Sequence, residues 1–249
     1  PEAVENITVH ALVERQVEKT PDEIALSFET ISLSYTQLNE RANRLAHHLI
    51  EQGAGPDVLI GICAERAIDT VVAVLAVLKS GSAYVPIDPN YPAERISYML
   101  QDSQSPLLLT QTTVADQLPD SMATQICLDK FDWTQGKTSN PNTSDIGSVY
   151  AIYTSGSTGQ PKGVELTHQG LSNLIQWQSC QPGLEHAART LQFASLSFDV
   201  SFQEIFTTWA QGGTLVLVSE ELRRDLPQLA EFIATDNIER VYLPYAALQ

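Results

Sequence analysis

The sequence predicts an α/β fold of mostly parallel sheets flanked by helices. Apolar runs of strand length alternate with segments whose apolar residues recur at helical spacing, and this alternation is typical of strand–helix–strand units. A chain of 249 residues, 43% of them hydrophobic, can bury a substantial core as one large or two small domains. In such folds, ligands bind near the carboxyl ends of the strands.

In the first half of the chain, the sequence SYTQ at residues 34–37 indicates a capping box at the start of a helix. Apolar residues then recur at helical spacing over residues 38–49, and Gly53 ends the helix. The same patterns predict further strands at residues 58–62, 84–87 and 106–109, and further helices at residues 71–78 and 96–100.

In the second half, we expect strands at residues 149–153, 191–193, 214–218 and 238–243, and helices at residues 171–177, 202–209 and 226–233. Residues 134–148 are rich in Gly, Ser, Thr, Asn and Pro, so they predict a loop or a sub-domain boundary.

The formal net charge of −16 argues against nucleic acid as a partner and against an anionic membrane surface, because both bind Lys/Arg-rich faces. Any anion must therefore be held by local groups, such as backbone N–H groups, a helix N-terminus or one well-placed lysine.

Cys63, Cys127 and Cys180 lie far apart, without redox or metal-site spacing, so we expect reduced structural thiols and a cytoplasmic protein. No basic stretch with an apolar run behind it opens the sequence, so no signal peptide is expected. The longest apolar stretch, residues 71–78, is too short to span a bilayer.

The sequence predicts no metal site. His47 and His48 lie on a predicted helix with no further ligands in view, so we expect them on a solvated helix face. His168 and Glu204 are interpreted as ordinary helix residues.

The segment YTSGSTGQPKG, residues 153–163, carries the clearest chemistry. It follows a predicted strand and combines glycines, Ser and Thr hydroxyls and one lysine. Glycines allow backbone N–H groups to approach a ligand, and hydroxyls and a lysine bind phosphate oxygens. The alternative is a flexible linker, but a linker explains neither the Pro-Lys-Gly ending nor the strand before it. The spacing is that of neither a Walker loop nor G-x-G-x-x-G.

This segment resembles the signature loop of the adenylate-forming superfamily, which includes acyl-CoA synthetases, firefly luciferase and the adenylation domains of nonribosomal peptide synthetases. Three further stretches resemble core motifs of the peptide-synthetase branch: LSYTQL at residues 33–38, LKSGSAYVPID at residues 78–88 and FDVS at residues 198–201. They occur in family order and extend over essentially the whole chain, although Ser80 stands where Ala is commoner.

The resemblance implies that ATP and Mg²⁺ react with a carboxylic acid to give an acyl-AMP, whose acyl group passes to the phosphopantetheine thiol of a carrier protein. It assigns the ATP phosphates to one set of residues: Thr154, Ser155, Gly156, Ser157, Thr158, Gly159 and Lys162. Such a displacement at phosphorus depends on positioning and charge rather than on covalent chemistry.

The resemblance also implies an amino-acid site. Asp199 corresponds to the carboxylate that binds the substrate's α-ammonium group, and Phe198 would lie beside the reacting carboxylate. Acyl-CoA synthetases and luciferases have no amine to bind there, so Asp199 favours an amino acid. A surface or helix-capping role is the alternative for an isolated aspartate.

Val200, Gln203 and Tyr242 match further pocket positions, and the partial set Asp-Val-Gln-Tyr is similar to that of proline-activating domains. The alternative is that Val200 and Tyr242 are plain core residues.

The family's later motifs are not found, among them the adenine-stacking aromatic and the lysine of the small C-terminal sub-domain. We therefore expect residues 1–249 to form the N-terminal part of a truncated large sub-domain, with little activity alone. Apolar surface exposed by the truncation would favour self-association. Carrier-protein and condensation domains are the expected partners. Two alternatives remain: an acyl- or aryl-acid ligase, and a non-catalytic binding or assembly module.

Overall fold

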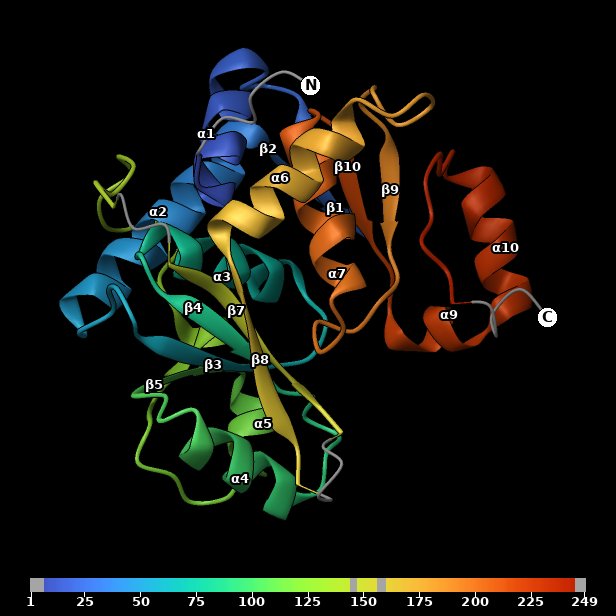
Figure 1. The fold of residues 1–249 in the computed structure, drawn as a ribbon. Helices are drawn as coiled ribbons and strands as arrows, with labels where there is room; N and C mark the ends of the chain where they lie inside the picture. Colours follow the sequence, from blue (N-terminus) through green and yellow to red (C-terminus); the bar gives the residue numbers. More distant parts are fainter. Residues whose placement is uncertain (1–6, 144–146, 156–159, 245–249) are drawn as a thin grey trace.

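A computed structural model describes residues 7–143, 147–155 and 160–244. In these residues the chain forms two sheets with helices between and around them (Figure 1). The six-stranded sheet has the order β6 (Thr124–Cys127), β5 (Leu107–Thr110), β3 (Leu59–Cys63), β4 (Ala83–Pro86), β7 (Ser148–Thr154) and β8 (Lys162–Thr167). The four-stranded sheet has the order β2 (Ile31–Ser34), β1 (Ile24–Phe28), β10 (Thr214–Leu217) and β9 (Arg189–Gln192).

All neighbouring strands pair in parallel except β1 with β2 and β7 with β8. The predicted α/β class with mostly parallel sheets is therefore confirmed. The carboxyl ends of β1, β3, β4, β9 and β10 all border one cavity, described below.

The helices follow the expected pattern in most places. They are α1 (Val9–Lys19), α2 (Tyr35–Glu51), α3 (Ile68–Lys79), α4 (Ala93–Asp102), α5 (Thr112–Ala115), the short η1 (Leu128–Lys130), α6 (His168–Ser179), α9 (Glu220–Arg224) and α10 (Leu226–Thr235). The helix predicted at residues 202–209 is a composite: α7 (Val200–Phe202) and α8 (Thr208–Ala210) flank a π-helical turn, η2 (Gln203–Thr207).

The capping box is confirmed at the start of α2, because the Ser34 hydroxyl accepts from the Gln37 N–H and the Gln37 side chain accepts from the Ser34 N–H. Helix α3 is buried along nearly its whole length and contacts both sheets, which makes it the central layer of the molecule (Figure 1). Its apolar run of residues 71–78 is therefore explained by burial on all sides.

Two large apolar clusters lie on opposite faces of the six-stranded sheet. The larger lies between the sheets and includes Tyr150 and Phe202, and the smaller includes Met99 of α4 and Tyr153 of β7. Successive residues of β7 thus face opposite sides, as the pleat requires. Tyr150, Ile152 and Thr154 share the face on which the α7 helix packs.

The strand predicted at residues 238–243 is wrong. Within the described part of this stretch, Arg240 alone pairs with the sheet, in a parallel bridge to Thr190. The Arg240 guanidinium donates to the Gln211 side chain and to the carbonyls of Leu184 and His186. This stretch is therefore held largely by one side chain instead of a strand ladder.

Residues 134–143 connect η1 to β7 and lie along α2. The Asn43 side chain donates to the Thr138 carbonyl at 2.6 Å and to the Asn140 side chain at 2.9 Å, while His47 Nε2 lies 2.9 Å from the Ser139 carbonyl. The sub-domain boundary expected near residues 134–148 stays a prediction.

One glycine tests the packing of the four-stranded sheet. A Cβ at Gly213 would lie 2.3 Å from the Ala188 carbonyl oxygen and 2.9 Å from the Ala188 nitrogen. Because both are backbone atoms, Gly213→Ala must separate the strands, and we expect a loss of roughly 1–3 kcal/mol in the free energy of unfolding. Gly170→Ala in α6 is the matched control, since its Cβ would meet nothing nearer than 3.8 Å. Equal urea midpoints for the two variants would contradict this packing.

Candidate active site

The β7–β8 hairpin carries the predicted phosphate loop. Thr154 and Lys162 are directly opposite each other in the strand register, and both are exposed, as is Ser155. The structure therefore brings together the two ends of the loop on one face of the hairpin. Gly156, Ser157, Thr158 and Gly159 lie outside the described residues.

Helix α4 anchors the base of this loop. The Tyr98 hydroxyl donates to the Pro161 carbonyl at 3.2 Å, and the Tyr153 hydroxyl donates to the Asp102 carboxylate at 2.6 Å. The Tyr153 ring lies across Gly163, where a Cβ would be 3.3 Å from the ring. These contacts fix the hairpin end independently of any ligand.

Asp199 stands at the start of α7, with an exposed side chain. Its carboxylate makes no capping bond to the helix. Within the described ranges no hydrogen bond or ion pair to this carboxylate is found. The helix-capping alternative is therefore not supported, and the carboxylate is available to a ligand. Phe198 beside it is 62% exposed.

The α7 helix packs directly on β7. The Phe202 ring lies 5.9 Å from the Tyr150 ring, measured between centroids. Burial, and secondarily the negative charge of Asp199, raises the pKa of Tyr150 to about 12. Asp199 is thus near Tyr150, which is four residues before Thr154 on the same face of β7. At about 3.3 Å per residue, the two positions are ~13 Å apart along the strand.

The other three predicted pocket residues are partly buried. Val200 and Gln203 follow Asp199 on its helix, whereas Tyr242 comes from the chain after α10. The Gln178 side chain donates to the Tyr242 hydroxyl and accepts from the Thr207 hydroxyl. Tyr242 is therefore linked through α6 to the composite helix that begins beside Asp199.

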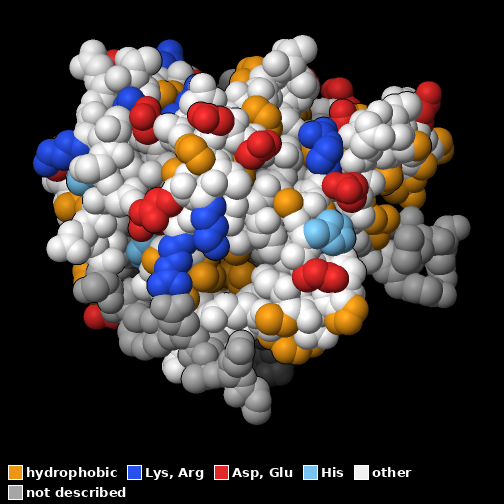
Figure 2. Space-filling view, turned by 90° about the horizontal axis from the view of Figure 1, so that it is seen from above, with side chains coloured by type: hydrophobic (Ala, Val, Ile, Leu, Met, Phe, Trp, Pro, Cys, Tyr) orange, Lys and Arg blue, Asp and Glu red, His pale blue; other side chains and the backbone are white. Residues whose placement is uncertain are grey.

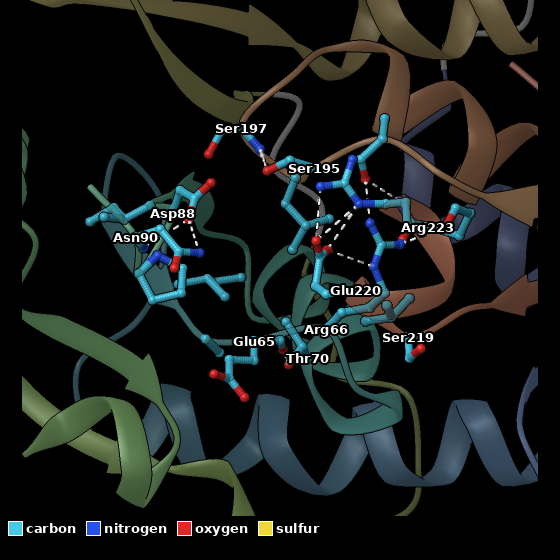
Figure 3. Close-up of a pocket in the computed structure, with 18 of the residues that line it drawn as sticks. Glu65, Arg66, Thr70, Asp88, Asn90, Ser195, Ser197, Ser219, Glu220 and Arg223 are labelled. Carbon is cyan, nitrogen blue, oxygen red and sulfur yellow. Dashed lines mark hydrogen bonds and ion pairs between the residues drawn. The ribbon is translucent and has the colours of Figure 1, made fainter. Parts of the chain in front are cut away.

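A cavity of about 480 Å³ lies where strands of both sheets end (Figure 3). Asp88 and Asn90, just after β4, line one wall, and Glu220 and Arg223 of α9 line the opposite wall. None of the described site residues predicted from the sequence lines this cavity. It adjoins the predicted site only through residues 195–197, which lead to Phe198.

Two charged residues beside this cavity were not predicted as site residues. Glu204, interpreted from sequence as an ordinary helix residue, is fully buried and accepts hydrogen bonds from the Phe193 and Ala194 N–H groups and from the Gln192 side chain. Arg66 donates to carbonyls of the same three residues. A lone glutamate flanked by large apolar residues was the available signal for Glu204, and nothing singled out Arg66.

Burial raises the pKa of Glu204 to about 7, although its hydrogen bonds and Arg66 favour the charged form. Burial likewise lowers the pKa of Arg66, and Glu220 opposes that effect.

The raised pKa of Glu204 predicts a pH dependence of stability. The folded protein holds this proton more tightly than the unfolded chain, whose value is near 4.5. This contribution is complete below pH 4.5 and is lost as the pH rises through about 7. The Glu204→Gln variant cannot titrate there. We therefore expect the difference in unfolding free energy, wild type minus variant, to fall over this range in urea titrations. A constant or rising difference would contradict the buried environment of Glu204.

Acidic side chains are spread over the face seen in Figure 2, with smaller groups of Lys and Arg between them. Across the described ranges, no cluster of three or more His, Cys, Asp or Glu side chains could hold a metal ion. Over the same ranges, no helix combines the length and apolar character that crossing a membrane requires.

The geometry defines an α/β protein with a ligand-sized cavity at its strand ends, beside an exposed polar hairpin and an unpaired aspartate. Comparison with protein families goes further. The model described as "AMP-binding enzyme" matches residues 13–249, and this chain belongs to that family.

Its relatives include very large synthases. The chain is 44% identical over 236 residues to one of the proteins that make up linear gramicidin synthase in Brevibacillus parabrevis, covering 94% of this chain and 3% of that protein. It is 41% identical over 246 residues to tyrocidine synthase 3 of Brevibacillus parabrevis, covering 94% of this chain and 4% of that protein. The chain thus spans a small fraction of these relatives.

Solved structures share the fold. The nonribosomal peptide synthetase FmoA3 in its AMPPNP-bound form matches with a TM-score of 0.88 and 28% identity, over 95% of this chain and 25% of that one. The N-terminal subdomain of Klebsiella oxytoca NpsA matches with a TM-score of 0.83 and 26% identity, over 95% of this chain and 61% of that one. The resemblance to peptide-synthetase adenylation domains is confirmed.

Proposed function

We propose that residues 1–249 form the N-terminal part of the large sub-domain of an amino-acid-activating domain, which converts an amino acid and ATP into aminoacyl-AMP and pyrophosphate. One observation carries this proposal. The unpaired carboxylate of Asp199 lies on a helix packed against the face of β7 that ends at Thr154 and Lys162. An ammonium anchor and a phosphate-binding loop are thus attached to the same strand.

In this reaction a carboxylate oxygen of the amino acid attacks the α-phosphorus of ATP. The bond from that phosphorus to the oxygen bridging to the β-phosphate breaks, and pyrophosphate leaves with the electron pair. Lys162 and the hydroxyls of Thr154, Ser155, Ser157 and Thr158 bind the β- and γ-phosphates and offset the charge that develops on pyrophosphate. Gly156 and Gly159 allow the backbone to approach the phosphates.

The donor set fits ATP bound with Mg²⁺. Lys162 and the hydroxyls supply charge and hydrogen bonds, while the described residues offer no multi-carboxylate cage. Mg²⁺ is commonly held by substrate phosphates with few protein ligands, and when bound it neutralises phosphate charge.

Asp199 would bind the α-ammonium group of the amino acid, with Phe198 beside its carboxylate. The spacing of ~13 Å between Tyr150 and Thr154 along β7 leaves room for an amino acid and the phosphates of ATP in line. Val200, Gln203 and Tyr242 would line the side-chain pocket. The partial set that they form with Asp199 favours proline as the substrate.

The aminoacyl group would then pass to the phosphopantetheine thiol of a carrier domain, with condensation domains as further partners. The support is the relatives, which are peptide synthases far longer than this chain. A cytoplasmic location is part of the same proposal.

The test is ATP–pyrophosphate exchange by the natural enzyme that contains this chain, across amino acids, fatty acids and aryl acids. We expect exchange with one amino acid, proline first, to exceed that with every fatty or aryl acid. Greater exchange with a fatty or aryl acid would identify the alternative, an acyl- or aryl-acid ligase. No exchange with any acid would favour a binding or assembly module.

A further inference from the structure

The chain between β9 and α7 is held at its base by Glu204. The Phe193 N–H donates to this carboxylate at 3.1 Å, and the Ala194 N–H lies 3.1 Å from both of its oxygens. Because Glu204 follows Asp199 by five residues, these bonds close residues 193–204 into a ring. Both Phe198 and Asp199 lie within this ring.

Arg66 holds the same backbone from the opposite side. Its guanidinium donates to the carbonyls of Gln192 at 2.6 Å, Phe193 at 3.0 Å and Ala194 at 3.3 Å. Arg66 lies between β3 and α3, and its side chain is only 8% exposed. Glu220 of α9 accepts from the Arg66 Nε at 3.3 Å and pairs with Arg223, as Figure 3 shows.

These contacts account for most backbone groups at the end of β9. The N–H groups go to an acid and the carbonyls go to a base, while the Gln192 side chain bridges Glu204 and the Ala194 carbonyl. Burying two charges is costly, as the raised pKa of Glu204 reflects. Neutral caps or backbone pairing could end a strand at lower cost, so the arrangement favours a role in fixing one loop conformation.

The loop that this network fixes is the one that carries the exposed Phe198 and Asp199. Asp199 itself has no hydrogen bond to hold its position among the described residues, and the π-helical turn that carries Glu204 begins soon after it. Functional groups need such support, because an anchor that is free to move loses both affinity and orientation.

We propose that Arg66 and Glu204 are positioning residues that clamp the 193–199 loop and thereby fix the Asp199 carboxylate for the substrate's ammonium group. This inference rests on the proposed function of Asp199. The clamp itself, defined as Arg66, Gln192 and Glu204, is a property of the described structure.

Hydrogen exchange of the purified chain tests the clamp without any activity. In Glu204→Ala, we expect amides 193–199 to exchange at least 10-fold faster than in the wild type, with amides of α2 unchanged. Glu204→Gln keeps the volume and one acceptor, so it should give a smaller increase and decides the matter if the alanine variant does not fold. Glu231→Gln, on the exposed face of α10, is the matched control. Unchanged exchange at 193–199 in a folded Glu204 variant would overturn the clamp.

Kinetics of the natural enzyme test the positioning role. In Glu204→Gln and Arg66→Lys, we expect the KM for the amino acid to rise about 10-fold while the KM for ATP stays within twofold. A general structural defect would change both constants, and that result, or no change in either, would overturn the role. Asp199→Ala, measured alongside, separates the two proposals. If it leaves the amino-acid KM unchanged, the assignment of Asp199 fails even where the exchange experiment supports the clamp.

Discussion

Lys162→Ala is expected to lower kcat/KM for ATP in amino-acid-dependent exchange by roughly 10²- to 10³-fold. This is the effect of removing one preorganised group that stabilises charge developing in a transition state. Lys162 is exposed and lies across the hairpin from Thr154, so its removal leaves the core untouched. Stability should therefore change by no more than about 0.5 kcal/mol.

Two variants make the result specific. Lys162→Arg keeps the charge but changes its shape and reach, so an intermediate rate is expected. Lys130→Ala removes an equally exposed lysine from η1 and should leave the rate unchanged. A Lys162→Ala enzyme with normal kcat/KM for ATP would exclude the phosphate-binding assignment.

Asp199→Ala is expected to raise the KM for the amino acid by roughly 10- to 100-fold, because a hydrogen bond between charged groups contributes about 1.5–3 kcal/mol. The KM for ATP should change little, since the hairpin is anchored by Tyr98 and Tyr153 and not by Asp199. Asp116→Ala, at an exposed carboxylate after α5, is the control. Equal amino-acid KM values for the two variants would show that Asp199 does not bind the substrate.

Much of the fold could be predicted from periodicity. The capping box before α2, the fully apolar α3 and the short strands of the six-stranded sheet all follow from local patterns. Strand β8 was missed because all its residues are exposed, so it lacks an apolar rhythm. The strand expected at residues 238–243 was wrong, because its apolar residues resemble a strand although Arg240 alone reaches the sheet.

The candidate site divides in the same way. The phosphate loop and Asp199 belong to short contiguous motifs, so the sequence could indicate them. Arg66 and the strand end that it binds are 126 residues apart in the chain, and Glu204 binds backbone groups whose direction depends on where β9 ends. Contacts of this kind arise only from tertiary packing, so no local pattern predicts them.

The central claim is that Asp199 recognises the ammonium group of an amino acid. The most direct measurement compares exchange with the preferred amino acid and with its analogue lacking the α-amino group, in the wild type and in Asp199→Asn. We predict that the wild type strongly prefers the amino acid, and that the substitution removes most of this preference by reducing exchange with the amino acid alone. An equal loss with both acids, or an unchanged preference, would contradict the account.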